Sequence, residues 1–412
     1  MEAKNTEKTA VIGCGPAGMM AALQAAKRNK QVLILEKEKR PAKKLLLTGD
    51  GRCNLTSTLR PQEMIDEIFR GQQFLYSAIF QFPPQATRDF FEKLGVKLKE
   101  ERGRRIYPAS NRAAEIKNKL IEELNNQGVR IKLATEVEKI LTSANTVTAI
   151  KLKGGKKIAV SSVILATGGI SYPETGSDGS GYRLAEDLGH KIKKPELALV
   201  PLKVENDWTS LAAGLKLKNV MVKLFWQEDL VKESFGEVII SKNKLTGSAI
   251  LIISCHLQEF KLENYKLAID LKPGLGKEKL ERRIQGDLDK YSNKYFKNAL
   301  KDLLPAKLRP VIVKLSRIPA DKVCHQITGR ERSELVKLLK NLPVKVTGKG
   351  GVKEAIITSG GLALEEVEPA TMASKKIAGL YFAGEILEPA AYTGGHNLQI
   401  AFSTGYLAGL NC

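Results

Sequence analysis

Three glycines near the start of the chain, Gly13, Gly15 and Gly18, have the spacing G-x-G-x-x-G. Such glycines allow a tight turn, let the backbone approach a pyrophosphate and permit close packing of a helix on a strand. Glu36 follows about 20 residues later, where a carboxylate accepts hydrogen bonds from ribose hydroxyls. An acid at this position favours an unphosphorylated ribose. The spacing therefore predicts a site for FAD or NAD rather than NADP.

A strand, a turn, a helix and a second strand must hold these residues in place. Residues 9–12 are apolar or β-branched, an Ala-rich stretch follows the glycines, and residues 31–35 form a second apolar run. Ala22 has a small side chain, which allows the helix to pack closely where it crosses the sheet. The order matches one βαβ unit, the context in which this glycine spacing indicates a dinucleotide site. The alternative, an ordinary strand–turn–helix corner, does not account for the agreement of all these features.

A second glycine-rich stretch, residues 43–57, reads KKLLLTGDGRCNLTS. It is too rich in turn formers to be a strand, so we expect a loop. Its backbone N–H groups and the Arg52 guanidinium could bind a phosphate or the edge of a flavin. The alternative is a surface turn. Cys53 places a thiol in the same loop.

Two later apolar strands also end in glycine turns. One is SSVILATGG, residues 161–169, and the other is IAGLYFAGE, residues 377–385. A turn containing Gly394 and Gly395 follows the second strand, and a closing helix is expected over residues 398–410. This order of strand, glycine turn and helix resembles the end of FAD folds of the two-dinucleotide-binding type, which implies a helix whose N-terminus is aimed at the N1–C2=O edge of a flavin.

Composition limits the class of protein. The chain has 412 residues, of which 43% are apolar, so we expect about two or three domains. It has no apolar run of about 18 residues, and Met1–Lys8 is charged. These features predict neither a membrane span nor a secretory signal, and hence a cytoplasmic protein. The five cysteines are scattered and the four histidines isolated, which argues against a disulfide framework or a metal site.

The net charge is +21, and more than half of it lies in one segment. Residues 261–350 contain 22 Lys and Arg against 10 Asp and Glu, an excess of 12. Such an excess attracts polyanions, either nucleic acid or an anionic membrane surface. The alternative is a lysine-rich composition without a partner. The local concentration of charge favours a partner.

The middle of the chain has a different pattern from its two ends. Short alternating strands, including SAILIIS at residues 248–254, predict a β-barrel-like insertion over residues 191–260. Residues 261–342 are expected to form a basic helical insertion, and residues 343–353 a return strand. Tyr291 and Tyr295 are interleaved with lysines, as in an RNA-stacking platform, but with Ala299 they also fit one apolar helical stripe facing a core. We favour the core for the rings.

Several motifs together carry a family resemblance. VIGCGPAGMMAA, KLLLTGDGRCNLTS, VILATGG with GSDGSGYRLAEDLGH, TSGGLALEEV, and GLYFAGEILE followed by TGGHNLQIAFSTG span nearly the whole chain. In this order they resemble the bacterial BaiN-like or aminoacetone oxidase-like NAD(P)/FAD-dependent oxidoreductases. The chain departs from that family at Asp50, where a third glycine is usual, and at residues 240–248, which lack a histidine.

The resemblance implies an α/β fold. Its Rossmann-like FAD-binding domain, of the two-dinucleotide-binding flavoprotein type, would comprise residues 1–190 and 354–412, interrupted by the β-barrel and helical insertions. Motifs and resemblance together predict 25 residues that contact FAD: Gly13, Gly15, Pro16, Ala17, Gly18, Glu36, Lys37, Lys44, Thr48, Gly49, Gly51, Arg52, Cys53, Asn54, Val137, Ala166, Thr167, Gly168, Gly169, Gly384, Glu385, Gly395, His396, Asn397 and Leu398.

The resemblance also implies the activity. Family members are linked to amine oxidation, bile-acid reduction and reduction of a uridine in ribosomal RNA to dihydrouridine. A strongly cationic protein repels a cationic amine but gains affinity for RNA through counterion release, so we expect an RNA substrate. A small-molecule oxidase or reductase, and a flavin-loaded RNA-binding assembly protein, are the alternatives.

The expected mechanism is hydride transfer from flavin N5 to C6 of an extruded uracil and protonation at C5. Cys53 is the first candidate for the proton donor and His396 the second, although Cys53 could equally be a small thiol that packs the loop. The chain has no second G-x-G-x-x-G motif with a flanking strand and helix. NAD(P)H, if it is the reductant, is therefore expected to visit the flavin transiently.

Overall fold

The computed structural model describes residues 8–28 and 30–412 and divides the chain into two compact units. The first unit extends to Leu197 and also includes Ala355–Cys412, and the second is Ala198–Glu354. Apart from Lys8, the charged N-terminal segment used above to argue against a secretory signal lies outside the described residues. Within the described part of the chain, none of the helices combines the length and apolar character needed to cross a bilayer.

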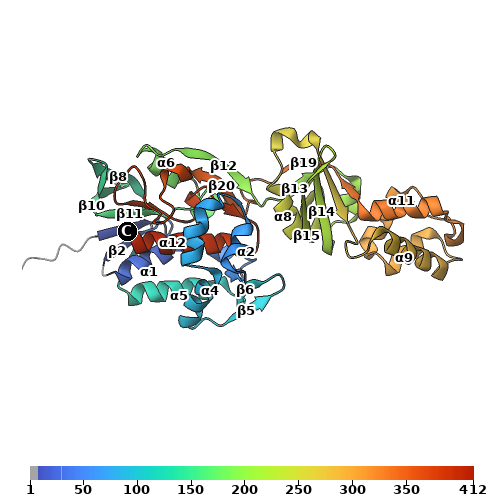
Figure 1. The fold of residues 1–412 in the computed structure, drawn as a ribbon, viewed down its shortest axis with the longest axis horizontal. Helices are drawn as coiled ribbons and strands as arrows, with labels where there is room; N and C mark the ends of the chain where they lie inside the picture. The colour runs from blue at the N-terminus through green and yellow to red at the C-terminus, as the bar shows by residue number, and fades with distance from the viewer. Residues whose placement is uncertain (1–7, 29) are drawn as a thin grey trace, which may run out of the picture. The chain divides into compact units, whose positions relative to one another are not determined.

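A five-stranded parallel sheet forms the centre of the first unit (Figure 1). Its order is β21-β11-β1-β2-β7, with strands β21 (Leu380–Phe382), β11 (Ser162–Leu165), β1 (Lys8–Ile12), β2 (Gln31–Leu35) and β7 (Arg130–Lys132). Strands β1, β2 and β11 are buried along most of their length, as expected for a parallel sheet covered on both faces. The predicted Rossmann-like α/β fold is confirmed.

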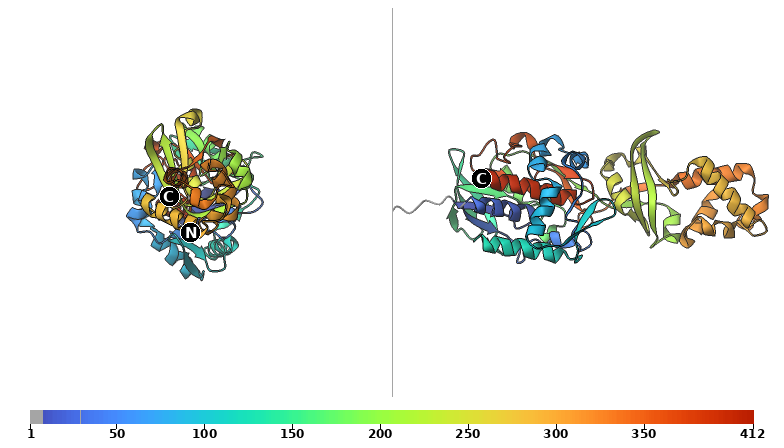
Figure 2. Two further views of the ribbon diagram at one scale, coloured as in Figure 1. Left: turned by 90° about the vertical axis from the view of Figure 1, so that its right-hand side faces the viewer. Right: turned by 60° about the horizontal axis from the view of Figure 1, so that its bottom comes forward.

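Helices α1 (Pro16–Lys27) and α12 (His396–Asn411) pack side by side in the first unit (Figure 2). Their close approach depends on small residues. A Cβ added at Gly409 would lie 2.1 Å from the carbonyl oxygen of Ala21, so α12 tolerates no side chain there. The last helix is thereby held against the first βαβ unit, and both belong to one hydrophobic core.

Shorter elements complete the first unit. A hairpin turns at residues 154–155, where β9 (Thr146–Leu152) pairs antiparallel with β10 (Lys157–Ala159). The remaining named elements are β3 (Thr56–Ser57), α2 (Pro61–Asp66), β4 (Ile68–Arg70), α3 (Tyr76–Gln81), α4 (Pro84–Lys93), β5 (Leu98–Glu101), β6 (Arg105–Pro108), α5 (Ala113–Asn126), β8 (Val137–Ser143), β9 (Thr146–Leu152), β10 (Lys157–Ala159), α6 (Ser180–Glu186), β12 (Ile192–Ala198), β20 (Ile357–Leu362) and β22 (Ala390–Ala391).

The second unit combines a seven-stranded antiparallel sheet with helices over a separate core. The sheet order is β18 (Leu342–Val344), β17 (Tyr265–Asp270), β14 (Lys216–Trp226), β15 (Asp229–Ser241), β16 (Lys244–Thr246), β13 (Leu202–Val204) and β19 (Val346–Lys349). The helices are α7 (Asp207–Leu211), α8 (Ser248–Ser254), α9 (Lys277–Lys290), α10 (Arg309–Ser316) and α11 (Gly329–Lys340). The Rossmann-like fold is therefore interrupted in sequence by an antiparallel sheet with helices.

The strand predicted at residues 248–254 is wrong, because this segment is helix α8. A short apolar run has no periodicity that separates a buried strand from a buried helix. Strand β17 also lies inside the segment expected to be helical, and it joins the same sheet as β14 and β18. The boundaries at residues 190, 260, 342 and 353 stay predictions.

The apolar stripe expected from Tyr291, Tyr295 and Ala299 is also wrong. Helix α9 ends at Lys290, and the 3-10 helix that contains Ala299 begins only at Phe296. Tyr291 and Ala299 are 6% and 0% exposed, whereas Tyr295 is 48% exposed. The break in the helix after Lys290 turns Tyr295 to the solvent.

Candidate functional site

The glycine turn after β1 leaves open space at the N-terminus of α1. Gly13 has a φ of +104°, and a Cβ there would lie 2.4 Å from the carbonyl oxygen of Ala166, so only glycine fits. A Cβ at Gly15 would meet nothing within 4 Å. Among the described contacts no side chain caps α1. Its free N–H groups and its dipole therefore form a site suited to an anion.

Glu36 lies at the end of β2 beside this turn. Its carboxylate accepts hydrogen bonds from the backbone N–H groups of Cys14, at 2.8 Å, and Glu38, at 2.9 Å. Burial raises the pKa of Glu36 above its usual value, and the two backbone hydrogen bonds act in the opposite direction. The carboxyl group is fixed in the position that the motif predicts for ribose recognition.

A cavity of about 1350 Å³, including the part open to solvent, extends from this turn through the first unit. Sixteen of the 25 predicted cofactor contacts line it: Gly13, Gly15, Pro16, Ala17, Glu36, Lys37, Lys44, Thr48, Val137, Ala166, Thr167, Gly168, Gly384, Glu385, Asn397 and Leu398. They come from both ends of the chain. The cavity could hold an extended dinucleotide, whose pyrophosphate would lie on α1.

Nine of the predicted contacts do not line the cavity: Gly18, Gly49, Gly51, Arg52, Cys53, Asn54, Gly169, Gly395 and His396. Several of them support its wall. The Arg52 guanidinium pairs with Glu101 at 3.0 Å and lies 4.3 Å from the centroid of the Tyr107 ring. With its amide oriented to satisfy both neighbours, Asn54 accepts from the N–H of Gly395 at 3.0 Å. This hydrogen bond joins the loop at residues 49–54 to the turn before α12, so each stabilises the conformation of the other.

The two proposed proton donors are both buried. Burial raises the pKa of the Cys53 thiol to about 12, while a hydrogen bond to Thr48 acts against it. Burial, with a smaller effect from Arg105, lowers the pKa of His396 to about 4. Neither side chain lines the cavity, but Thr48 does. Cys53 is thus one hydrogen bond away from the cavity wall.

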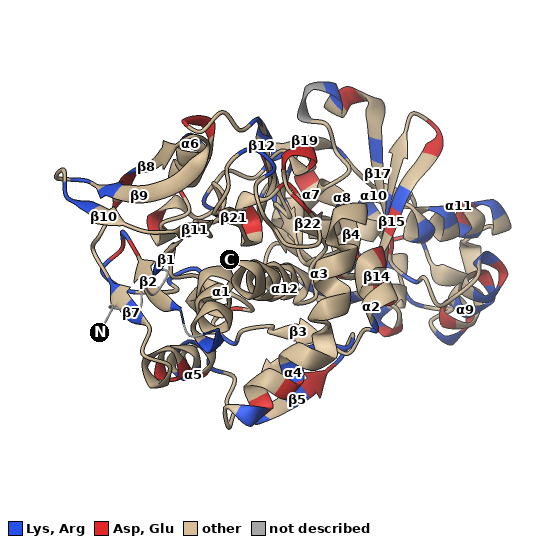
Figure 3. Cartoon of the chain, turned by 60° about the vertical axis from the view of Figure 1, so that its left-hand side comes forward, with Lys and Arg blue, Asp and Glu red and all other residues tan. Residues whose placement is uncertain are grey.

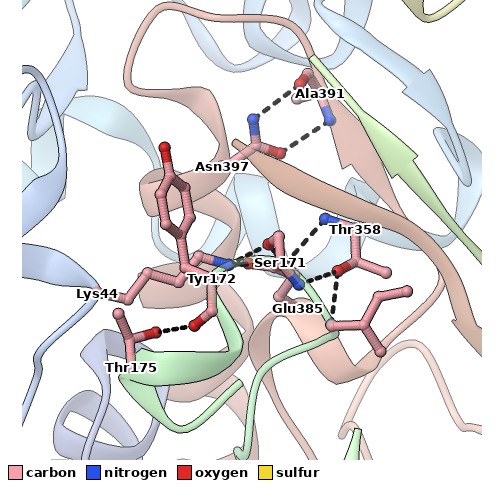
Figure 4. A network of polar contacts seen from close by, with 9 residues as sticks. Lys44, Ser171, Tyr172, Thr175, Thr358, Glu385, Ala391 and Asn397 are labelled. Carbon is pink, nitrogen blue, oxygen red and sulfur yellow. Dashed lines mark hydrogen bonds and ion pairs between the residues drawn. The ribbon is translucent and has the colours of Figure 1, made fainter. Parts of the chain in front are cut away.

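An ion pair at the cavity wall joins segments far apart in the sequence (Figure 4). The Lys44 ammonium donates to both carboxylate oxygens of Glu385, at 2.7 and 2.9 Å, and also to the Ser171 hydroxyl. Glu385 additionally accepts from Ser171 and from the backbone N–H of Thr358, each at 2.9 Å. Three donors fix this carboxylate through four hydrogen bonds. The ammonium is consequently a positioned positive charge in the cavity.

Helix α12 directs its N-terminus toward the same cavity. Asn397, in its first turn, bonds the backbone of Ala391 twice, accepting from the N–H at 3.0 Å and donating to the carbonyl at 2.7 Å (Figure 4). This pair ties the start of α12 to β22. Asn397 and Leu398 both line the cavity, so a helix dipole is available to stabilise negative charge there.

Sequence reasoning missed part of the lining. Ile356, Ile357 and Pro389 belong to apolar or turn segments that carry no motif, and only the fold brings them to the cavity. Four other missed residues belong to the glycine-rich segment that leads into α6, including the first residue of that helix: Thr175, Gly176, Ser177 and Ser180. Their glycine-rich composition is a signal that could have found them.

Charge in the second unit is concentrated on its helical part. Lys and Arg lie along α11 and beside α9 (Figure 3). Several are paired, including Lys322 with Glu331 and Lys340 with Asp270. Even if every Asp and Glu between residues 261 and 350 paired with a Lys or Arg, 12 basic residues of this segment would have no acidic partner within it.

Comparison with known proteins gives matches over the whole length. The HI0933-like protein Rossmann domain family matches residues 7–411. The chain is 33% identical over 405 residues to the 3-dehydro-bile acid delta(4,6)-reductase of Clostridium scindens, with 97% of each protein covered. It is 28% identical over 404 residues to the ribosomal RNA dihydrouridine synthase of Escherichia coli K12, covering 96% of this chain and 95% of that protein.

A solved structure shares the fold. The 3-ketosteroid-delta4-(5alpha)-dehydrogenase of Rhodococcus jostii RHA1 aligns with a TM-score of 0.55 and 16% identity, covering 100% of this chain and 97% of that one. The family resemblance read from the motifs is confirmed. The chain belongs to the HI0933-like family of Rossmann-fold proteins and is an FAD-dependent oxidoreductase.

Proposed function

We propose that this oxidoreductase reduces a uridine of ribosomal RNA to dihydrouridine. The observation that carries the proposal is the local excess of 12 basic residues over residues 261–350. Each phosphate that such residues neutralise releases counterions and strengthens binding of a nucleic acid. Two relatives over almost the whole chain are named ribosomal RNA dihydrouridine synthases. Their names and the charge point to the same class of substrate.

The cavity fits FAD, which would supply hydride-transfer chemistry when bound. Gly15 leaves open space above the first N–H groups of α1, where the pyrophosphate would lie. Glu36 would accept hydrogen bonds from the ribose hydroxyls, and the predicted contacts that line the cavity farther along, Lys44, Thr48, Asn397 and Leu398, would lie around the ring. We also propose NAD(P)H as the reductant that visits this site, since no second glycine fingerprint provides a nicotinamide domain.

A second candidate function is reduction of a small enone. It is favoured by the relative at 33% identity, whose name describes a bile acid delta(4,6)-reductase. The chemistry required of the protein is similar, since uracil also has a carbon–carbon double bond conjugated to a carbonyl. The basic segment favours RNA over the small enone, because a single small molecule offers few negative charges for the segment to neutralise.

The test is a map of dihydrouridine in ribosomal RNA from cells that lack the protein. Loss of one modified position supports the enzyme. Intact modification with defective ribosomal subunits would favour an RNA-binding assembly role instead. Unaltered RNA, together with turnover of a steroid enone or peroxide release on adding small amines, would contradict the proposal in favour of a small substrate.

The Lys44 ammonium is expected to stabilise the negative charge that reduction adds to the bound cofactor. Replacing Lys44 by methionine should lower the two-electron reduction potential of bound FAD by about 30 to 60 mV, where about 30 mV corresponds to 1.4 kcal/mol. The measurement is a spectroscopic redox titration. Lys37→Met is the matched control, because Lys37 lines the same cavity but bonds Asp178 and Ser180. An equal shift in both variants would contradict a specific role for Lys44.

Cys53 and His396 are the proton donors that we propose to test. A thiol with a pKa of about 12 keeps its proton at neutral pH, and Thr48 connects Cys53 with the cavity. We expect Cys53→Ala to slow reoxidation of the reduced cofactor by substrate by about 100-fold, the usual size of a lost proton donor. His396→Ala is measured in parallel. Unchanged rates in both variants would remove both residues from the reaction.

A further inference from the structure

A group of lysines surrounds two tyrosines where α9 gives way to the following 3-10 helix. We call this group the Tyr295 platform and define it by Lys290, Tyr291, Lys294, Tyr295, Lys297 and Lys301. It lies in the second unit, next to α9 in Figures 1 and 3. The FAD cavity has no lining residue in it.

Three ammonium groups lie around the Tyr291 ring. The Nζ atoms of Lys301, Lys290 and Lys294 lie 4.7, 5.3 and 5.8 Å from its centroid. The Tyr291 hydroxyl donates to Asp302 at 2.6 Å, and Lys290 pairs with the same carboxylate at 2.8 Å. One carboxylate thus balances one of several neighbouring cations. The repulsion between like charges held close together in this way decreases when a polyanion binds.

The other cations of the platform are free to meet such a ligand. In the described part of the chain, Lys294, Lys297 and Lys301 have no carboxylate partner. Each of their ammonium groups lies near a tyrosine ring, with Lys297 Nζ 5.7 Å from the centroid of Tyr295, and Lys301 also lowers the pKa of the neighbouring Asp302 by its charge. All three side chains are exposed.

The backbone holds the Tyr295 ring outward. On one side, the carbonyl of Lys294 accepts from the N–H of Cys324 at 2.9 Å, and on the other the N–H of Phe296 donates to the backbone carbonyl of Lys322 at 2.8 Å. The Phe296 side chain is fully buried, whereas Tyr295 is 48% exposed. A ring displayed by a fixed backbone loses little conformational freedom when it stacks on a ligand.

From these contacts we infer that the Tyr295 platform binds a single-stranded segment of RNA, with an unpaired base stacked on Tyr295 and the backbone phosphates on Lys294, Lys297 and Lys301. Aromatic rings flanked by cations bind single strands in this way, and stacking requires a base that is not paired. The inference rests on the proposed function, because it names the surface that would bind the RNA substrate. An anionic membrane is less suitable, since the exposed neighbours of Tyr295 in the sequence, Asn293 and Asn298, are polar and offer no apolar side chain for insertion.

The experiment measures binding of a fluorescent oligouridine, about 12 nucleotides long, to the full-length FAD-loaded protein over a series of salt concentrations. The same oligonucleotide without bases is the second probe. The variants are Tyr295→Ala, Tyr295→Phe and a triple change of Lys294, Lys297 and Lys301 to glutamine. Two controls match them: Tyr76→Ala, an exposed tyrosine of α3, and a triple glutamine change at Lys139, Lys156 and Lys157, which removes the same charge elsewhere.

Tyr295→Ala should weaken binding of oligouridine about tenfold, leave the salt dependence unchanged and have no effect on the probe without bases. Tyr295→Phe should restore affinity. The platform triple variant should lower the slope of log affinity against log salt by about 2, since each neutralised phosphate of a single strand contributes about 0.7. Unchanged affinity in Tyr295→Ala, or equal losses in the two triple variants, would overturn the inference.

Two further readouts separate the possible failures. Phosphatidylserine vesicles provide the membrane alternative, and a platform variant that loses vesicle binding while keeping RNA binding would overturn the inference. The function itself is read from the dihydrouridine map. If dihydrouridine is intact in cells lacking the protein but RNA binding depends on Tyr295, the platform binds RNA and the proposed reaction is contradicted. If a dihydrouridine is lost but RNA binding does not depend on Tyr295, the proposed reaction is supported and the platform inference is overturned.

Discussion

Gly15→Val should give a folded protein that no longer retains FAD. The backbone of Gly15 has φ −88° and ψ −176°, which valine adopts without strain, and nothing lies within 4 Å of the added Cβ. The side chain would instead fill the space above the N-terminus of α1, where the pyrophosphate needs close access to the backbone. We expect FAD affinity to fall about 1000-fold, which corresponds to about 4 kcal/mol.

The measurement is the visible absorbance of the purified variant and its titration with FAD. Gly274→Val is the matched control, because Gly274 is likewise a glycine with open space at its Cβ position but lies outside the cavity. The control should be yellow and the variant colourless, with similar unfolding temperatures for the FAD-free proteins. A Gly15→Val protein that carries a full complement of FAD would contradict the assigned pyrophosphate position.

The buried His396 should make the protein less stable in acid. Its pKa falls from 6.5 to about 4 on folding, chiefly because burial disfavours the charged ring. Between these values the unfolded chain binds the proton and the folded chain does not, so stability is complete above about pH 6.5 and is lost as the pH falls toward 4. The loss amounts to about 3 kcal/mol at the acid end of this range.

This dependence is measured by chemical unfolding of the FAD-free protein at about pH 7 and about pH 4.5. His396→Gln should lose most of the additional acid sensitivity, although it is less stable at neutral pH because the buried site is repacked. His325→Gln, at an exposed histidine, is the control and should keep the acid sensitivity of the parent. The same pH dependence in both variants would show that His396 is not its source.

The parts of the site that depend on local sequence could be predicted. The turn at Gly13 and Gly15 and the carboxylate of Glu36 lie within one βαβ unit, whose geometry follows from spacing alone. Strand β21 and the Gly384 turn after it could be placed from their own local pattern of apolar residues followed by glycine. Residues such as Ile357 and Pro389 reach the cavity only through tertiary packing, which no local pattern encodes.

Burial was the property hardest to predict. Cys53 and His396 lie in polar, glycine-rich stretches, and for Cys53 the sequence left an accessible proton donor and a small thiol that packs the loop as equal alternatives. Both side chains are buried, because the 49–54 loop and the turn before α12 pack on each other. The reverse occurred at Tyr295, where helical spacing suggested a core position. The end of α9 at Lys290 removes that periodicity and exposes the ring.

The two units provide different features for the proposed reaction. The first unit provides an FAD-type cavity with a fixed cation at Lys44, and the second provides a basic surface with an exposed aromatic ring. The cavity alone would suit either a uracil or a steroid-type enone. Only the basic segment, with its 22 Lys and Arg, distinguishes a polyanionic substrate from a small one.

Reoxidation of the reduced protein by RNA tests this claim most directly. The FAD-loaded protein is reduced without oxygen and mixed with large-subunit ribosomal RNA from cells that lack it, while cofactor absorbance and dihydrouridine content are followed together. We predict that the cofactor is reoxidised as one uridine position is converted to dihydrouridine, in equal amounts. Reoxidation by a steroid enone and none by the RNA would contradict the account.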